Sequence, residues 1–351
     1  MSQERDELIV ALGEIGKELA LFSQKATHDS FNRLIDESLY NKFNATVARE
    51  HINNAWFTED NIRESLKNIS SWLTKNELNK WVENYAYTDK AKRVGVIMAG
   101  NIPLVGFHDL LSVLLSGNTA VVKMSSNDQQ LLPVVLDLFA VFYPDISKRV
   151  EFSTDFKSID AMIATGSNNS ARYFEKYFGH LPTIIRKNRT SVAVLTGEES
   201  EEELIHLGDD IFSYFGLGCR NVSKVFVPAE YDFDPFFKAI YKYSDIVHHH
   251  KYANNYDYYK AIYLMNRESL LENGFLITRE TNELFAPVAV LYKQFYQSKK
   301  EVSDFIKENE NKLQVVLGRD FQPFGSSQQP TLTDYADGVD TMAFLNKVNQ
   351  L

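Results

Sequence analysis

Short apolar runs alternate with longer helical patterns between residues 93 and 178, and this alternation limits the possible folds most strongly. The runs VGVIMAG, TAVVKMSS and AMIATGS are predicted strands, and a helical stretch follows each of them. Strands linked through helices imply right-handed crossovers and a largely parallel sheet. Ligands bind beyond the carboxyl ends of such strands, which here are residues 99–101, 123–126 and 165–167.

A second alternation of strands and helices begins near Arg186. SVAVLTG, SKVFVP, AVLYKQF and LQVVLG are predicted strands, and helices are predicted in EESEEELIHLGDDIFSYFGLG and DPFFKAIYKYSDI. Residues 1–90 are predicted to be mostly helical, because apolar residues recur three to four apart from Ile9 to Leu19. Thr58 is a candidate cap for one of these helices. The length of 351 residues suits about two domains.

The composition excludes several classes of protein. Lys and Arg number 37 against 47 Asp and Glu, which gives a net charge of −10, and no basic stripe predicts a nucleic-acid partner. No apolar run reaches the roughly 18 residues of a membrane span. The charged N-terminus lacks the features of a signal peptide. Since one cysteine cannot form an internal disulfide, we expect a reduced, cytoplasmic protein.

Cys219, the only cysteine, lies in a turn between a predicted helix and a predicted strand. Such a lone thiol is either a small buried apolar residue or a nucleophile. Gly216 and Gly218 make the turn permissive and allow a substrate carbonyl to approach closely. The neighbouring Arg220 either favours the thiolate or is a solvated charge of the turn.

Polar residues stand at the carboxyl ends of the predicted strands. Asn101 is either the N-cap of the next helix or a donor to a developing oxyanion. Lys123, with Ser125 and Ser126, suits ribose or phosphate binding, although an ordinary lysine at a strand end would look the same. Gly166 and Ser167 form a turn whose backbone N–H groups can meet an anion. No GxGxxG or phosphate-loop motif is present.

The run His248–His250 does not predict a metal site. Three adjacent histidines cannot all face one ion on a helix or a strand, and no cysteine or carboxylate motif supports them. We expect a role at a helix end or on the surface, and no metal.

Taken in order, these segments resemble the aldehyde dehydrogenase superfamily. VGVIMAGNIPLVGFHDLLSVLLSGNTAVVKMSS is similar to its strand, Asn-X-Pro turn, helix and strand-Lys segment. IATGS resembles its glycine turn, FGLGCRNVSKVFVP its nucleophile segment and ELFAPVAVL its Glu-X-Phe-X-Pro-Val segment. IRKNRTSVAVL, FGLGCRNVS and DYADGVDTMAFL resemble the branch of LuxC-type acyl-CoA reductases, known from bacterial luminescence.

The resemblance implies an aldehyde-dehydrogenase-like α/β fold with two Rossmann-like, doubly wound domains and an N-terminal helical region. Residues 1–185 would hold the helices and the dinucleotide-binding domain, and residues 186–325 the catalytic domain. The tail, 326–351, would pack back or onto a partner subunit. Each candidate residue receives a role: Cys219 as acylated nucleophile, Asn101 as oxyanion donor, Lys123 with Ser125 and Ser126 at the cofactor ribose, Gly166 and Ser167 over the dinucleotide, Glu283 as ribose-binding carboxylate and Phe285 beside the nicotinamide.

Two departures from the superfamily pattern bear on the chemistry. The stretch TIIRKNRTS holds no carboxylate where oxidising members have a glutamate that activates water. A missing general base slows hydrolysis of an acyl-enzyme, which suits a reductase. Ser126 stands where NAD-preferring relatives often have a glutamate that would repel a 2′-phosphate. We therefore expect NADPH, with NADH possible.

The expected reaction is NADPH-dependent reduction of a fatty acyl-CoA to the aldehyde through an acyl-cysteine at Cys219, with release of CoA. Alternatives are an acyl-accepting subunit of a complex fed by a partner acyl-protein synthetase, or an acyl-phosphate reductase. Arg186, Lys187 and Arg189 either meet the phosphates of CoA or form a solvated loop. A homodimer or larger oligomer is expected from relatives.

Overall fold

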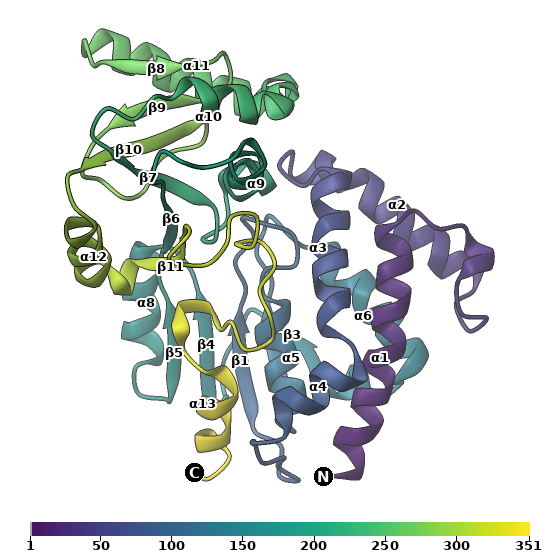
Figure 1. Cartoon of the computed structure of the whole chain (residues 1–351). Helices are drawn as coiled ribbons and strands as arrows, with labels where there is room; N and C mark the ends of the chain where they lie inside the picture. The colour runs from purple at the N-terminus through teal and green to yellow at the C-terminus, as the bar shows by residue number, and fades with distance from the viewer. Residues whose placement is uncertain (1) are drawn as a thin grey trace. The chain divides into compact units, whose positions relative to one another are not determined.

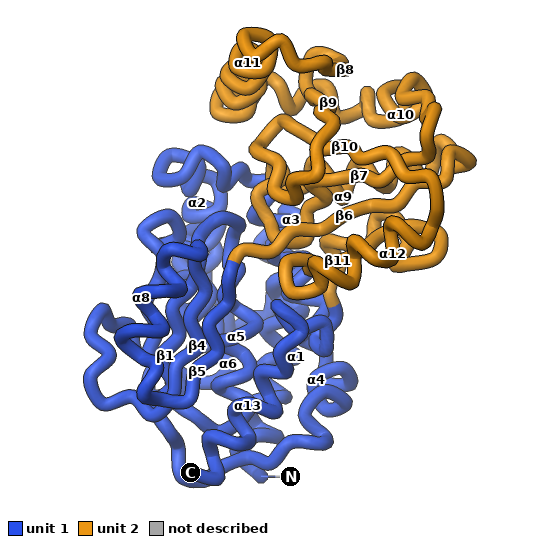
Figure 2. The backbone as a smooth tube through the Cα atoms, turned by 90° about the vertical axis from the view of Figure 1, so that its left-hand side faces the viewer, with its two compact units in different colours: residues 1–187, 331–351 blue, residues 188–330 orange. Residues whose placement is uncertain are grey.

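The structure of the chain is a computed structural model that describes residues 2–351, which form two compact units. Unit 1 comprises the chain up to Lys187 together with Thr331–Leu351, and unit 2 comprises Asn188–Pro330 (Figure 2). The prediction of an α/β fold with an N-terminal helical region is confirmed.

Unit 1 begins with helices that pack on one another and on α6 of the sheet layer (Figure 1). Thr58 caps the third helix as predicted, because its side chain accepts a hydrogen bond from the amide of Asn61. The helices are α1 (Gln3–Ser23), the 3₁₀ turn η1 (His28–Ser30), α2 (Glu37–Asn53), α3 (Glu59–Trp72) and α4 (Lys75–Val82).

The sheet of unit 1 is entirely parallel and has the strand order β3-β2-β1-β4-β5. Its strands are β1 (Arg93–Ile97), β2 (Thr119–Lys123), β3 (Val150–Phe152), β4 (Ala161–Thr165) and β5 (Thr183–Arg186). The linking helices are α5 (Phe107–Leu115), α6 (Leu131–Phe142), α7 (Ile146–Arg149) and α8 (Asn168–Phe178). The chain leaves β1 on one side, through β2 to β3, and returns on the other side through β4. This reversal is the doubly wound pattern.

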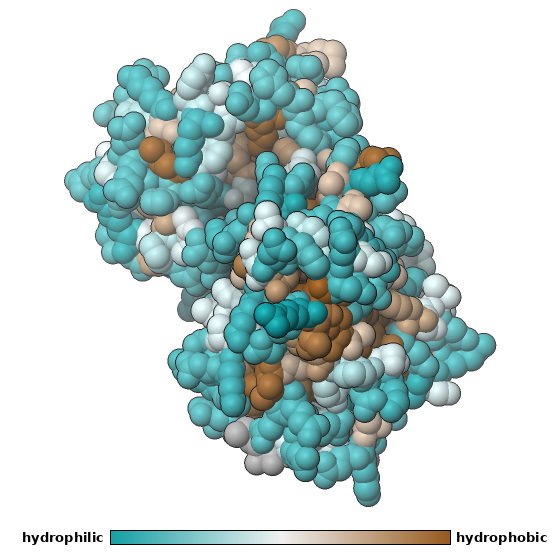
Figure 3. Space-filling view, turned by 90° about the vertical axis from the view of Figure 1, so that its right-hand side faces the viewer, coloured by the Kyte–Doolittle hydropathy of each residue, from teal (hydrophilic) through white to brown (hydrophobic). Residues whose placement is uncertain are grey.

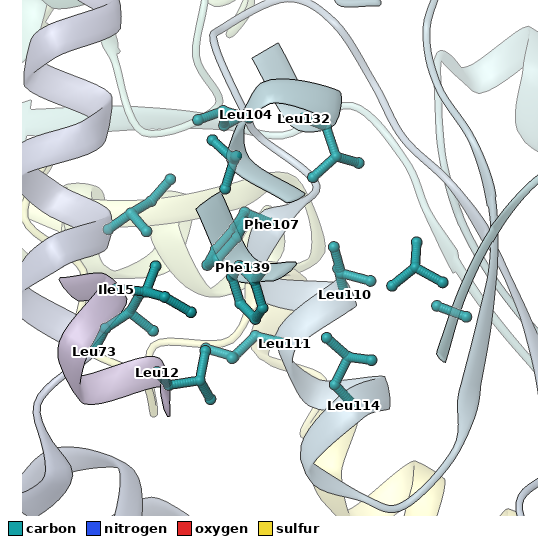
Figure 4. Packing of buried hydrophobic residues seen from close by; sticks show 14 of the residues in the cluster. Leu12, Ile15, Leu73, Leu104, Phe107, Leu110, Leu111, Leu114, Leu132 and Phe139 are labelled. Atoms are coloured by element: carbon teal, nitrogen blue, oxygen red, sulfur yellow. The ribbon is translucent and has the colours of Figure 1, made fainter. Parts of the chain in front are cut away.

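The core of unit 1 joins the N-terminal helices to the sheet layer. The apolar stripe of α1 turns inward, so that Leu12 and Ile15 are fully buried. Figure 4 shows these two side chains with Leu111 and Phe139, which come from α5 and α6. At about 1.5–3 kcal/mol for each fully buried side chain, this stripe accounts for the attachment of the helical region.

Unit 2 is built on a six-stranded sheet with the order β11-β6-β7-β10-β9-β8, in which only the edge strand β8 runs antiparallel. Its strands are β6 (Thr190–Val194), β7 (Val222–Pro228), β8 (Leu270–Glu272), β9 (Ile277–Glu280), β10 (Val290–Tyr296) and β11 (Leu313–Leu317). The helical elements are α9 (Glu201–Phe212), η2 (Ser213–Gly216), α10 (Asp234–Ala239), η3 (Ile240–His248), α11 (His250–Met265), α12 (Lys299–Glu308) and η4 (Glu310–Lys312).

The C-terminal segment belongs to unit 1, where η5 (Ala336–Gly338) and α13 (Thr341–Val348) follow one another and α13 packs on α5. Arg186 ties this segment down, with its guanidinium 2.6 Å from the Asp109 carboxylate and 2.9 Å from the Thr341 hydroxyl. Only 3% of Arg186 is exposed, so this residue is neither available to the phosphates of CoA nor part of a solvated loop. For Arg186 both interpretations were wrong, because the local sequence does not show its contact with the distant Asp109.

Polar side chains cover most of the face drawn in Figure 3, with apolar areas between them. Val10 of α1 and Ile52 of α2 are among the exposed apolar residues of unit 1. Within residues 2–351, none of the helices has both the length and the apolar character to cross a membrane.

Candidate active site

Four of the predicted site residues lie at the carboxyl ends of the strands of the unit 1 sheet. Asn101 follows β1, Lys123 ends β2, and Gly166 with Ser167 follows β4. Because β1 lies between β2 and β4 and the chain reverses there, these turns flank a topological switch point, where α/β sheets bind ligands. The sheet therefore gathers Asn101, Lys123, Gly166 and Ser167 at one edge.

Asn101 lies in an exposed turn between β1 and α5 and does not cap the helix. The helix begins six residues later, with Gly106 at the N-cap, so the helix-cap interpretation was wrong. Pro103 and the left-handed Leu104 (φ 56°) prolong the turn. Its backbone is held by buried side chains: Ser65 donates to the Pro103 carbonyl at 2.8 Å, and Asp128 accepts from the Leu104 amide at 2.9 Å.

The turn after β2 packs directly against the Asn101 turn. The Met98 amide donates to the Lys123 carbonyl at 3.0 Å, which continues the pairing of the two strands. A side chain at Gly100 would overlap the Ser125 hydroxyl, so only glycine allows this approach. Lys123 and Ser126 are exposed and Ser125 is partly buried. A cation and hydroxyls at this edge fit the ribose and phosphate of a dinucleotide.

The turn after β4 leads into α8. Ser167 is the N-cap residue, and its hydroxyl accepts from the Ser170 amide at 3.2 Å. A Cβ at Gly166 would lie 2.9 Å from the Ser170 Cβ, so the glycine lets the turn close on the helix. The Ser167 hydroxyl accepts from one backbone amide of the first turn of α8. The other amides of that turn are the donors that could bind an anion.

Cys219 of unit 2 follows an unusual left-handed turn. After α9 the residues Tyr214, Phe215 and Gly216 have φ angles of 52°, 59° and 78°, and two of them are not glycine. Such backbone costs of order 1–3 kcal/mol per non-glycine residue and persists only where the surroundings impose it. Cys219 itself is partly exposed, as a nucleophile must be.

Buried Asn221 holds both ends of this turn. Its amide nitrogen donates to the carbonyls of Asp210 at 3.1 Å and Ser213 at 2.9 Å, at the end of α9. Its side-chain oxygen accepts from the Gly218 amide at 2.8 Å. One side chain thus closes the helix and fixes the residue before Cys219. Sequence reasoning missed this role, because the only local signal is an asparagine near a turn.

Two further contacts hold the Cys219 backbone and its neighbour. Ser191 donates to the Cys219 carbonyl at 3.1 Å, and Arg220 donates to the Ser327 carbonyl at 3.3 Å. Buried Asp210 anchors Ser327 in turn, by accepting its amide at 3.0 Å. Arg220 is therefore not a solvated charge of the turn, and its effect on the thiolate stays a prediction.

Glu283 and Phe285 lie in the segment between β9 and β10. Both are exposed, whereas Leu284 between them is buried. The Tyr292 hydroxyl donates to the Glu283 carboxylate at 3.2 Å. β7 and β10 are neighbouring parallel strands, so both begin at the same end of the sheet. The segment with Glu283 and Phe285 leads into β10 at this end, and the Cys219 turn leads into β7 there.

The histidine run lies at a helix junction, as expected. His248 ends η3, and His249 is the N-cap of α11, where its ring accepts from the Tyr252 amide at 3.4 Å. Among residues 2–351, no group of three or more His, Cys, Asp or Glu side chains could hold a metal ion.

Comparisons with known proteins agree on the class. A family model described as acyl-CoA reductase (LuxC) matches residues 19–236, more than half of the chain. A search of curated proteins found no match. Aldehyde dehydrogenase 21 from Physcomitrella patens, solved with succinate, is 12% identical with a TM-score of 0.60 over 90% of this chain and 74% of that one.

Two structures of an aldehyde dehydrogenase from Bacillus cereus are also similar. A point mutant of that enzyme is 16% identical with a TM-score of 0.60, and the match covers 91% of this chain and 72% of that one. An NAD⁺ complex is 17% identical with a TM-score of 0.58, over 90% and 72% of the two chains. The fold is thus that of an aldehyde dehydrogenase. Within that class, the chain belongs to the acyl-CoA reductase (LuxC) family, whose members are oxidoreductases acting on acyl groups.

Proposed function

We propose that this protein reduces a fatty acyl-CoA to the aldehyde through a thioester at Cys219, with NADPH as the preferred reductant. The observation that supports this proposal most is the position of Cys219. The only thiol of the chain is partly exposed directly after a strained turn, and hydrogen bonds from Asn221 and Ser191 hold the backbone around it.

In the first half of the reaction, the Cys219 thiolate attacks the carbonyl carbon of the acyl-CoA. The new bond joins that carbon to Sγ, the bond to the CoA sulfur breaks, and CoA leaves as a thiolate that takes up a proton. Asn101 would donate its side-chain amide to the oxyanion, a contact of about 3 kcal/mol or roughly a hundredfold in rate.

In the second half, Cys219 is the leaving group. A bound nicotinamide would supply the hydride to the thioester carbonyl carbon. The carbon–sulfur bond then breaks, the aldehyde is released, and the thiolate is restored. Lys123, Ser125 and the turn at Gly166 and Ser167 would hold the dinucleotide, with Glu283 and Phe285 from unit 2.

Two features favour reduction with NADPH over oxidation with NAD⁺. The stretch 183–191 holds no carboxylate to activate water, so the acyl-enzyme would survive until it is reduced. Exposed Ser126 can donate to a 2′-phosphate and does not repel it.

The test is the loss of nicotinamide absorbance when purified protein receives acyl-CoAs of graded chain length. We expect turnover with acyl-CoA, faster with NADPH than with NADH, and none in Cys219→Ala. Turnover with acyl phosphate and none with acyl-CoA would replace this proposal by that alternative. Acylation only in the presence of a partner synthetase would favour the acyl-accepting subunit.

A further inference from the structure

Lys224 of β7 is a lysine with no exposed surface. Its ammonium donates to the carbonyls of Thr281 at 2.8 Å and Glu283 at 3.0 Å. It also lies 5.4 Å from the ring centre of Phe226 and 5.0 Å from that of Phe305. The charge is thus enclosed by two aromatic rings and two backbone carbonyls of one segment.

A bulge in β7 adds a third contact to that segment. The pairing with β6 passes from Ser191–Val222 to Val192–Lys224, which leaves Ser223 without a partner in the ladder. The Ser223 hydroxyl donates to the Leu284 carbonyl at 2.6 Å and also lies 2.6 Å from the Thr190 hydroxyl. Bulges of this kind redirect side chains next to active sites. Adjacent residues of one strand therefore hold the carbonyls of residues 281, 283 and 284.

Stability alone does not account for a lysine at this position. Burial lowers the pKa of Lys224 to about 8, with the nearby Glu283 carboxylate acting in the opposite direction. Burying an ammonium costs free energy that an apolar side chain of similar volume would not. What the lysine supplies is a charged donor that reaches two carbonyls at once.

We propose that Lys224, with Ser223, is a positioning residue that fixes the backbone of segment 281–285, from which Glu283 and Phe285 project. The inference rests on the proposed function, in which these two side chains contact the nicotinamide nucleotide. Loss of the ammonium would let the segment move and would weaken nucleotide binding. Acylation of Cys219, which needs no nucleotide, would be spared.

The test compares Lys224→Met with Lys224→Arg, which keeps the charge and the donors. Lys293→Met is the matched control. Lys293 is also buried, but it pairs with Val225 and so points to the other face, over the rings of Phe233 and Phe295. Binding of NADPH and NADH is followed by nicotinamide fluorescence, acylation by the intact mass, and backbone mobility by hydrogen exchange.

In Lys224→Met, we expect amide exchange within 281–285 to rise at least tenfold and the nucleotide Kd to rise about ten- to a hundredfold. Acylation should change less than threefold. Lys224→Arg should stay within about threefold of the wild type in Kd, and Lys293→Met should bind nucleotide as the wild type does. Should Lys224→Met not fold, Ser223→Ala provides the same test with a smaller change.

Unchanged exchange within 281–285, or unchanged nucleotide affinity, would overturn the inference. So would an equal loss of acylation and nucleotide binding, because that pattern indicates general damage. A wild-type protein that binds neither nucleotide refutes the proposed function instead, while hydrogen exchange still decides whether Lys224 fixes the segment.

Discussion

Replacement of Asp128 by asparagine should stabilise the protein, relative to the wild type, more at pH 8 than at pH 5. Asp128 is 8% exposed, and its Oδ2 accepts from the Leu104 amide in the Asn101 turn. Its Oδ1 is buried with no hydrogen-bond partner among residues 2–351. Burial raises the pKa of Asp128 from 3.8 to about 6; the Leu104 amide opposes this increase and the Glu50 carboxylate adds to it.

The sign of the effect follows from the raised pKa. Between pH 3.8 and about 6, the folded protein holds a proton on Asp128 that the unfolded chain has released, so stability falls as the pH rises through this window. At about 1.4 kcal/mol per pKa unit, the full difference is about 3 kcal/mol. When the pH is lowered from 8 to 5, the free energy of unfolding of the wild type should rise by about 1.4 kcal/mol of this full difference. Asparagine keeps an acceptor for Leu104 and does not titrate.

The assay is urea unfolding of the wild type and Asp128→Asn at pH 5 and pH 8. The free energy of unfolding of Asp128→Asn minus that of the wild type should be about 1.4 kcal/mol larger at pH 8 than at pH 5. Asp137→Asn is the control, because this carboxylate is exposed on α6 and pairs with Lys42. An equal difference at both pH values would show that Asp128 does not have a raised pKa in the folded protein.

Four further predictions concern the site and its supports. Asn101→Ala should slow acylation of Cys219 about a hundredfold without abolishing it, measured by quenched-flow mass spectrometry; an unchanged rate would remove Asn101 from the reaction. Asn221→Ala should lower the free energy of unfolding by about 3 kcal/mol and abolish acylation, because it leaves the carbonyls of Asp210 and Ser213 without this donor; a stable, active variant would contradict this. Ser126→Glu should raise the Kd for NADPH at least tenfold relative to NADH, and an unchanged ratio would exclude a 2′-phosphate contact. Asp109→Asn should cost about 3 kcal/mol in urea unfolding, because it leaves the buried Arg186 charge uncompensated, and a loss below 1 kcal/mol would argue against the ion pair.

The regular part of the fold was predictable because its signals are local. The strands β1, β2 and β4 are continuous apolar runs, and their helices have apolar stripes, so alternation alone indicated a parallel sheet. The strands β3, β5, β8 and β9 escaped prediction because they have only three or four residues each, and β3 and β8 are also partly exposed. Strand pairing stabilises them where their own sequence provides little signal.

The supports of the site were not predictable, because each depends on a contact between distant residues. Arg186 has a basic neighbourhood in sequence, but its partner Asp109 lies 77 residues away. In the sequence, Lys224 is indistinguishable from an ordinary strand lysine, because its partner Thr281 lies 57 residues away. Asn101 was assigned correctly to the turn after β1, but the start of its helix was set by Leu104 and Asp128, which the local pattern does not show.

The most direct test is the intact mass of the protein after exposure to a fatty acyl-CoA without nucleotide. We expect a gain of one acyl group, located on Cys219 by peptide mapping. This acyl group should persist much longer than one turnover and should be released as the aldehyde when NADPH is added. An unmodified wild-type protein that nevertheless turns over acyl-CoA, or an acyl group found on another residue, would contradict it.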